Sequence, residues 1–224
     1  MTELKTRSIL DARLNSLSEK ITQLSSLVDE AIVNAMDSLY KRDAILALSV
    51  IEGDQQVNEL RYSIEEEALH ILATQQPMAT DLRRVIAAIH IAVELERIGD
   101  HASGIAVLVE RMESEDEIDS LHKLPKMAKR ARSMVQIGTE AYAKNDEALA
   151  FTLIAQDDKL DRQYRKLFGE TIEEMRDDDY IRRATYLLWV GHDLERIGDR
   201  ATNIAERVIF MNTGKHIEVS YIPD

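Results

Sequence analysis

The sequence predicts an all-α protein made of two tandem, pseudo-symmetric three-helix bundles, each running up, down and up, with six long helices in total. Apolar residues recur at alternating steps of three and four, which is the spacing of one helix face. Leu, Ala, Ile, Glu and Arg are abundant, whereas the chain has only 3 Pro, 8 Gly and 5% aromatic residues, a composition that favours helices over strands. The sequence Glu-Arg-Ile-Gly-Asp at residues 96–100 occurs again at residues 195–199, so the chain contains an internal repeat.

The first half of the chain is expected to contain three helices. The first follows an apolar stripe from Leu10 to Leu39. A short polar connection comes next, in which Asp43 is placed to cap the second helix. The second helix continues to about Gln75, where Gln-Gln-Pro interrupts it because proline blocks helix continuation. The third helix ends near Met112.

The second half repeats this order after an acidic segment, residues 114–120, which lacks an apolar face and is interpreted as a linker. The offset between the halves is 103 residues at Asp43 and Asp146 but 99 residues at the repeated motif, so a shortening by four residues is expected before the last helix. In that last helix Trp189 is interpreted as a core residue, like Met134 and Met175 earlier in the half. The predicted domains are 1–113 for the first bundle, 114–122 for the linker, 123–213 for the second bundle and 214–224 for a C-terminal tail.

Charge and composition exclude several function classes. The net charge of −13 disfavours nucleic acid and anionic lipid as partners and favours cations or basic protein surfaces. Zero cysteines exclude disulfides and thiolate metal ligands. There is no N-terminal signal pattern and no apolar run of about 20 residues, so a soluble, cytoplasmic protein without direct membrane insertion is expected. No nucleophile elbow, phosphate-binding Gly loop or zinc spacing is present, and a non-enzymatic protein is therefore predicted.

The repeated motif places two carboxylates one helical turn apart on the same surface. At about 100° per residue, Glu96 and Asp100 lie roughly opposite the core stripe of their helix. The preceding helix carries Asp54 and Asn58 at the same spacing, beside its own stripe, so the two pairs could converge from adjacent helices. Oxygen-only clusters suit divalent cations such as Mg, Mn and Fe. The predicted metal ligands of both halves are Glu96, Asp100, Glu195, Asp199, Asp54, Asn58, Asp157, Asp161 and Asn203.

A solvated acidic face is the competing interpretation, because 41 acidic residues give many such pairs by chance. It is the favoured one for Asp54 and Asn58 taken alone. For the duplicated motif a cation site is favoured, because Gly99 and Gly198 recur in register and indicate close approach of a neighbouring helix or a bound group. His192 lies near the second acidic face, but the repeat has Val93 at that position and does not support a nitrogen ligand.

These motifs resemble those of PhoU, the family of phosphate-specific transport accessory proteins of bacteria, over nearly the whole chain. The resemblance rests on both Glu-Arg-Ile-Gly-Asp segments and on two segments that precede the first of them, Asp54-Gln-Gln-Val-Asn58 and Gln76-Pro77-Met-Ala-Thr-Asp81-Leu82-Arg83. It implies two three-helix bundles whose Glu/Asp-x-x-x-Asp motifs bind metal clusters on the bundle surface. The family motif falls on Glu96 and Asp100 in the first half and on Glu195 and Asp199 in the second.

The resemblance also implies a function. It predicts a cytoplasmic, homodimeric negative regulator of phosphate uptake and of the phosphate-starvation response. Such a protein acts as an adaptor between the ATPase of the phosphate ABC transporter and a sensor histidine kinase. The metal is not specified and could be Fe, Mn, Mg or Zn, as a single divalent ion or a polynuclear cluster.

Two alternatives stay open at this point. The same carboxylates could belong to a metal-dependent enzyme, a phosphohydrolase or an oxidase, or the chain could be a purely structural helical adaptor without metal. One departure from the repeat bears on the site itself. Asn58 stands where the second half has Asp161, so the first site would carry one negative charge fewer.

Overall fold

The structure, a computed structural model, describes residues 2–112, 121, 123–176 and 180–217. These residues form six α-helices and no strand, which confirms the predicted fold class. The helices are α1 (Thr2–Lys41), α2 (Ala44–Gln75), α3 (Thr80–Arg111), α4 (Leu124–Lys144), α5 (Glu147–Glu174) and α6 (Ile181–Thr213). Most of the predicted linker, 114–122, and of the predicted tail, 214–224, lies outside the described residues, so the domain boundaries stay a prediction.

The second helix of each half begins at an aspartate cap, as the sequence predicts. The side chain of Asp43 accepts a hydrogen bond from the backbone N–H of Leu46 at 2.9 Å, and Asp146 accepts one from Leu149 at the same distance. Each cap satisfies one of the donors that a helix start leaves unpaired. The helices that follow have 32 residues in α2 and 28 in α5, which agrees with the expected shortening by four.

The apolar stripes face inward and form one continuous core. Burial of such stripes is the main driving force for helix packing, because isolated helices gain little stability from propensity alone. Large, fully buried side chains come from helices of both halves and include Leu14, Leu17, Ile21, Leu24, Ile32, Ile64, Ile71, Ile91, Leu95, Ile98, Ile105 and Leu124, as well as Leu153, Leu160, Leu167, Leu194, Ile197 and Ile204. Trp189 is an exception to the prediction: 56% of it is exposed, so its interpretation as a core residue is wrong, whereas Met134 is fully buried.

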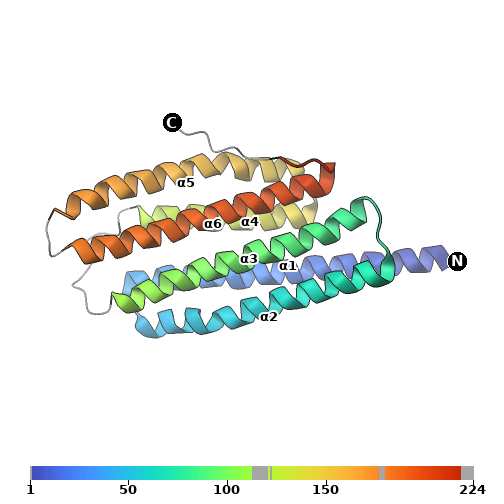
Figure 1. Ribbon diagram of the computed structural model, residues 1–224, viewed down its shortest axis with the longest axis horizontal. Coiled ribbons are helices and arrows are strands. Elements are labelled where there is room, and N and C mark those ends of the chain that lie inside the picture. Colours follow the sequence, from blue (N-terminus) through green and yellow to red (C-terminus); the bar gives the residue numbers. More distant parts are fainter. Residues whose placement is uncertain (1, 113–120, 122, 177–179, 218–224) are drawn as a thin grey trace.

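The two halves lie side by side, with α3 packed along α6 in the middle of the molecule (Figure 1). We call this contact the α3–α6 seam. Glu94 of α3 pairs with Arg200 of α6 at 3.5 Å, and His101 of α3 lies 3.0 Å from Asp193 of α6. Because residue numbers rise along α3 as they fall along α6, the two helices are antiparallel. A second contact between the halves joins α1 and α4, where Arg132 makes two hydrogen bonds to Asp29 at 2.9 and 2.8 Å.

No helix in the described part of the chain is both long enough and apolar enough to cross a membrane.

The glycine of each repeated motif lies where a side chain of the neighbouring helix packs closely against the backbone. A Cβ atom built at Gly198 would lie 2.3 Å from Leu160 of α5, and one at Gly99 would lie 3.1 Å from Val57 of α2. The structure therefore explains this repeated glycine by close approach of a neighbouring helix rather than by a bound group. Gly53, on α2, has nothing within 4 Å of the same position.

These contacts predict opposite effects for the same substitution. Gly198→Ala is expected to lower the free energy of unfolding by about 1–2 kcal/mol, because overpacking at Leu160 exceeds the gain in helix propensity. Gly53→Ala is expected to raise it by about 1 kcal/mol, since there only the propensity changes. Urea denaturation measures both, and an equal effect of the two substitutions would contradict the packing explanation.

Candidate metal centre

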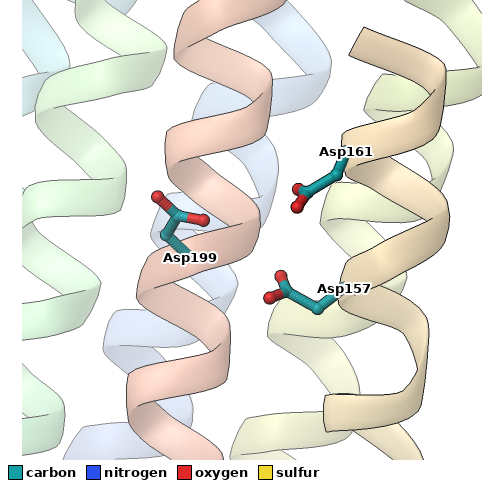
Figure 2. A group of neighbouring side chains, drawn as sticks. All are labelled: Asp157, Asp161 and Asp199. Atoms are coloured by element: carbon teal, nitrogen blue, oxygen red, sulfur yellow. The ribbon is translucent and has the colours of Figure 1, made fainter. Parts of the chain in front are cut away.

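Three aspartates from two helices meet at the contact between α5 and α6. Asp157 and Asp161 project from α5 one turn apart, toward α6, where Asp199 lies (Figure 2). Each of the three offers a carboxylate oxygen within 4.8 Å of the others. Within the residues described by the structure, no other group of three or more acidic, histidine or cysteine side chains comes this close. A divalent cation bound by oxygens at about 2–2.6 Å could contact all three.

Glu195 adds a fourth carboxylate to this group, and we refer to the four residues as the α5–α6 cluster. Its side chain is 23% exposed, and its Oε2 atom is buried without a hydrogen-bond partner. The nearest basic atom is His192 Nδ1 at 3.7 Å, which is too far for a hydrogen bond. A buried carboxylate oxygen without a partner is costly, and a bound cation would satisfy it. The residues present therefore fit a metal site with oxygen ligands.

Burial raises the pKa of all four carboxyls, and the charges of neighbouring carboxylates raise it further. Burial raises the pKa of Glu195 to about 7, with further contributions from the charges of Asp199 and Asp161. Burial likewise raises the pKa of Asp157 to about 6, and the charges of Asp161 and Asp199 add to it. The pKa values of Asp161 and Asp199 are raised as well, mainly by burial. Like charges held together in this way are stabilised by a counter-ion, which is the electrostatic condition that a cation site provides.

Two neighbouring side chains donate hydrogen bonds to the cluster, and one of them also supplies positive charge. Arg196, inside the repeated motif, donates a hydrogen bond to Asp199 at 2.6 Å. Thr202 donates to Asp157 at 3.2 Å. Burial and nearby carboxylates raise the pKa of Asp161 and Asp199 by more than the charges of nearby arginines lower it, namely Arg162, Arg165, Arg196 and Arg200. These arginines therefore do not fully compensate the cluster, and a cation is still favoured.

The first half repeats the arrangement with weaker electrostatics. Asn58 donates to Asp54 at 2.9 Å, an interaction that its counterpart Asp161 could not make as a carboxylate. Burial raises the pKa of Asp54, and the charge of Asp100 raises it further. The pKa of Glu96 is raised by burial and by Asp100. Asp54 Oδ1 is buried without a hydrogen-bond partner, as Glu195 Oε2 is in the second half.

The structure thus brings together eight of the nine predicted residues, four in each half, at the contacts α2–α3 and α5–α6. Their places differ from the prediction in two respects. The repeated pairs do not lie on an open face opposite the core, because the neighbouring helix half-buries them, with Asp199 31% and Glu195 23% exposed. Asn203 lies apart from the cluster, and its amide donates to Glu94 across the α3–α6 seam at 3.2 Å.

Sequence reasoning missed the charged residues that join the halves beside the motifs. Glu94 and Asp193 are both acidic and 99 residues apart, and His101 and Arg200 are both basic at the same offset. The repeat therefore contained the signal, an acid two residues before each motif and a base immediately after it. Without the antiparallel packing of α3 on α6, nothing indicated that each acid would meet the base of the other half.

Fold and site together define a class of protein: an all-helical molecule of two similar three-helix halves, each with an acidic, oxygen-donor group between its last two helices. The sequence model described as the PhoU domain matches residues 21–109 and 124–208. The chain belongs to the PhoU family, as the resemblance of its motifs indicated.

Individual relatives agree with this assignment over nearly their whole length. A "Phosphate-specific transport system accessory protein PhoU homolog" of Clostridium acetobutylicum is 31% identical over 217 residues, covering 96% of this chain and 99% of the relative. The crystal structure of PhoU from Pseudomonas aeruginosa superposes with a TM-score of 0.87 at 34% identity, covering 92% of this chain and 99% of that one. The phosphate transport system regulatory protein PhoU from Streptococcus pneumoniae gives the same TM-score at 30% identity, covering 94% of this chain and 100% of that one.

Proposed function

We propose that this chain is an accessory protein of a phosphate transport system that regulates uptake by docking to other proteins rather than by catalysis. The match of both halves to the PhoU domain carries this proposal. Relatives that align with more than nine-tenths of the chain are named as accessory or regulatory proteins of phosphate transport. The proposed partners are the transporter ATPase and a sensor kinase, and the proposed outcome is repression of uptake and of the starvation response when phosphate is plentiful.

We further propose that the α5–α6 cluster binds a divalent cation, with Asp157, Asp161, Asp199 and Glu195 as ligands. The convergence of three aspartates and the buried oxygen of Glu195 support this assignment. The oxygen-only donor set favours Mg, Mn or Fe over Zn, which prefers nitrogen and sulfur. A bound cation would neutralise charge at this contact and hold α5 against α6.

A binding experiment tests the proposal. Wild-type protein is expected to capture purified transporter ATPase and kinase in pull-downs that compare phosphate-rich with phosphate-poor buffer. The double variant Asp100→Ala, Asp199→Ala is expected to lose metal, by elemental analysis of protein purified without chelator, and to weaken capture. Asp37→Ala is the matched control, because Asp37 is an exposed acid paired with Lys41 on α1.

The same variants distinguish the docking function from the alternative that the protein is a metal-dependent enzyme. A carboxylate-bridged phosphohydrolase or oxidase would show turnover with Mn or Fe that disappears in the double variant. Turnover of this kind without capture of either partner would contradict the docking function.

A further inference from the structure

Arg200 lies between two acids that belong to different parts of the molecule. It directly follows Asp199 on α6, and its Nη1 atom is 3.5 Å from Oε2 of Glu94 across the α3–α6 seam. The side chains of Arg200 and Glu94 are only 20% and 14% exposed, so water screens their attraction weakly. The Nε atom of Arg200 is buried without a hydrogen-bond partner. The guanidinium of Arg200 therefore lacks one of its hydrogen bonds, and a change in the charge of a neighbouring side chain can shift its position.

Glu94 contacts this guanidinium from α3, and a hydrogen bond fixes the position of its carboxylate. Asn203 donates to the same Oε2 atom at 3.2 Å, which fixes the orientation of the carboxylate. Asp199 attracts Arg200 as well: burial raises the pKa of that carboxyl, and the charges of Arg196 and, to a smaller extent, Arg200 lower it. Arg196 already donates a hydrogen bond to Asp199 at 2.6 Å, so Arg200 is a second guanidinium near this carboxylate. Because one guanidinium cannot pair fully with both Glu94 and Asp199, the position of Arg200 changes how much negative charge the α5–α6 cluster keeps.

We propose that Glu94 is a positioning residue for the α5–α6 cluster: by holding Arg200 across the α3–α6 seam, it keeps that guanidinium from neutralising Asp199 and so raises the affinity of the cluster for a divalent cation. This inference rests on the proposed cation binding. It makes the affinity of a site in the second half depend on a residue of the first half. A related contact lies at the pseudo-symmetric position, where Asp193 is 3.0 Å from His101, the residue after Asp100, and pairs with it as an ion only when the imidazole is protonated.

Cation affinity is the first test, measured as Mn²⁺ binding by titration calorimetry on the full chain. Glu94→Gln keeps the size of the side chain but releases Arg200 toward Asp199, so Mn²⁺ is expected to bind about tenfold more weakly. Adding Arg200→Met to that variant is expected to restore at least wild-type affinity, because the competing charge is gone. A merely structural role of Glu94 would not be rescued in this way.

Asp29→Asn is the matched control, because it breaks another ion pair between the halves, Asp29 with Arg132, away from the cluster. It is expected to leave Mn²⁺ affinity unchanged. An equal loss in the control, or wild-type affinity in Glu94→Gln, overturns the inference.

A second measurement needs no metal. The coupling between Arg200 and Asp199 is obtained from double-mutant cycles by denaturation in EDTA, in the wild-type and Glu94→Gln backgrounds. The coupling is expected to rise when Glu94 is replaced, and an unchanged coupling overturns the inference. If the coupling rises but wild-type protein binds no Mn²⁺, the cation function is wrong and the positioning contact stands.

Discussion

With divalent cations chelated, the free energy of unfolding is expected to be about 2 kcal/mol smaller at pH 8 than at pH 5, after a discount for solvent screening of the half-exposed carboxylates. The folded-state pKa values of Glu195 and Asp157 are about 7 and about 6, against 4.5 and 3.8 for the unperturbed groups. The folded protein therefore keeps protons that the unfolded chain has already released. The stability from these groups is fully present below their unfolded pKa values and is lost as the pH rises through the folded ones.

Urea denaturation in EDTA across this pH range measures the effect. Glu195→Gln removes the carboxyl with the largest shift, so the variant is expected to show a flatter profile and higher stability than wild type at pH 8. Mn²⁺ is expected to restore wild-type stability most strongly at pH 8, where the carboxylates are deprotonated and can bind a cation. A wild-type stability that does not change between pH 5 and pH 8 in EDTA would contradict the raised pKa values of Glu195 and Asp157.

Loss of two of the three converging aspartates is expected to abolish high-affinity cation binding. The double variant Asp161→Asn, Asp199→Asn keeps the side-chain volumes but removes two charges, and Mn²⁺ affinity is expected to fall about 100-fold. Asp54→Asn, in the first half, is the matched control. It is expected to change the affinity of the tightest Mn²⁺ site little. Calorimetry gives affinity and stoichiometry for each variant.

Adding a carboxylate to the first half tests whether charge explains the difference in cation affinity between the two halves. Asn58→Asp supplies the carboxylate that the first half lacks and removes the amide that donates to Asp54. It is expected to strengthen cation binding in the first half about tenfold. If Asn58→Asp leaves the binding isotherm unchanged, charge at this position is not what separates the two halves.

Local patterns in the sequence predicted the helices because the relevant physics is local. A stripe at steps of three and four must be buried on one side, and an aspartate before such a stripe caps a helix, as Asp43 and Asp146 do. The pairing of Asp157 and Asp161 with Asp199 was also accessible, because short connections make sequence neighbours antiparallel. Trp189 is different: its spacing along α6 predicted a core position, but the burial of a residue depends on which neighbouring helix packs there, and Trp189 is 56% exposed.

The sequence by itself determined the helical class, the two similar halves, the membership of the PhoU family and which carboxylates recur in register. The helical class, the two halves and the recurring carboxylates follow from periodicity and repetition along the chain, whereas family membership rests on the resemblance of its motifs to those of the family. Only the tertiary structure decided how the halves face each other, with Glu94 meeting Arg200 and His101 meeting Asp193 along the α3–α6 seam. It also decided that the acidic groups are half-buried, which gives Glu195 its raised pKa. Contacts between residues about 100 positions apart depend on the packing of whole helices, and no local pattern encodes their geometry.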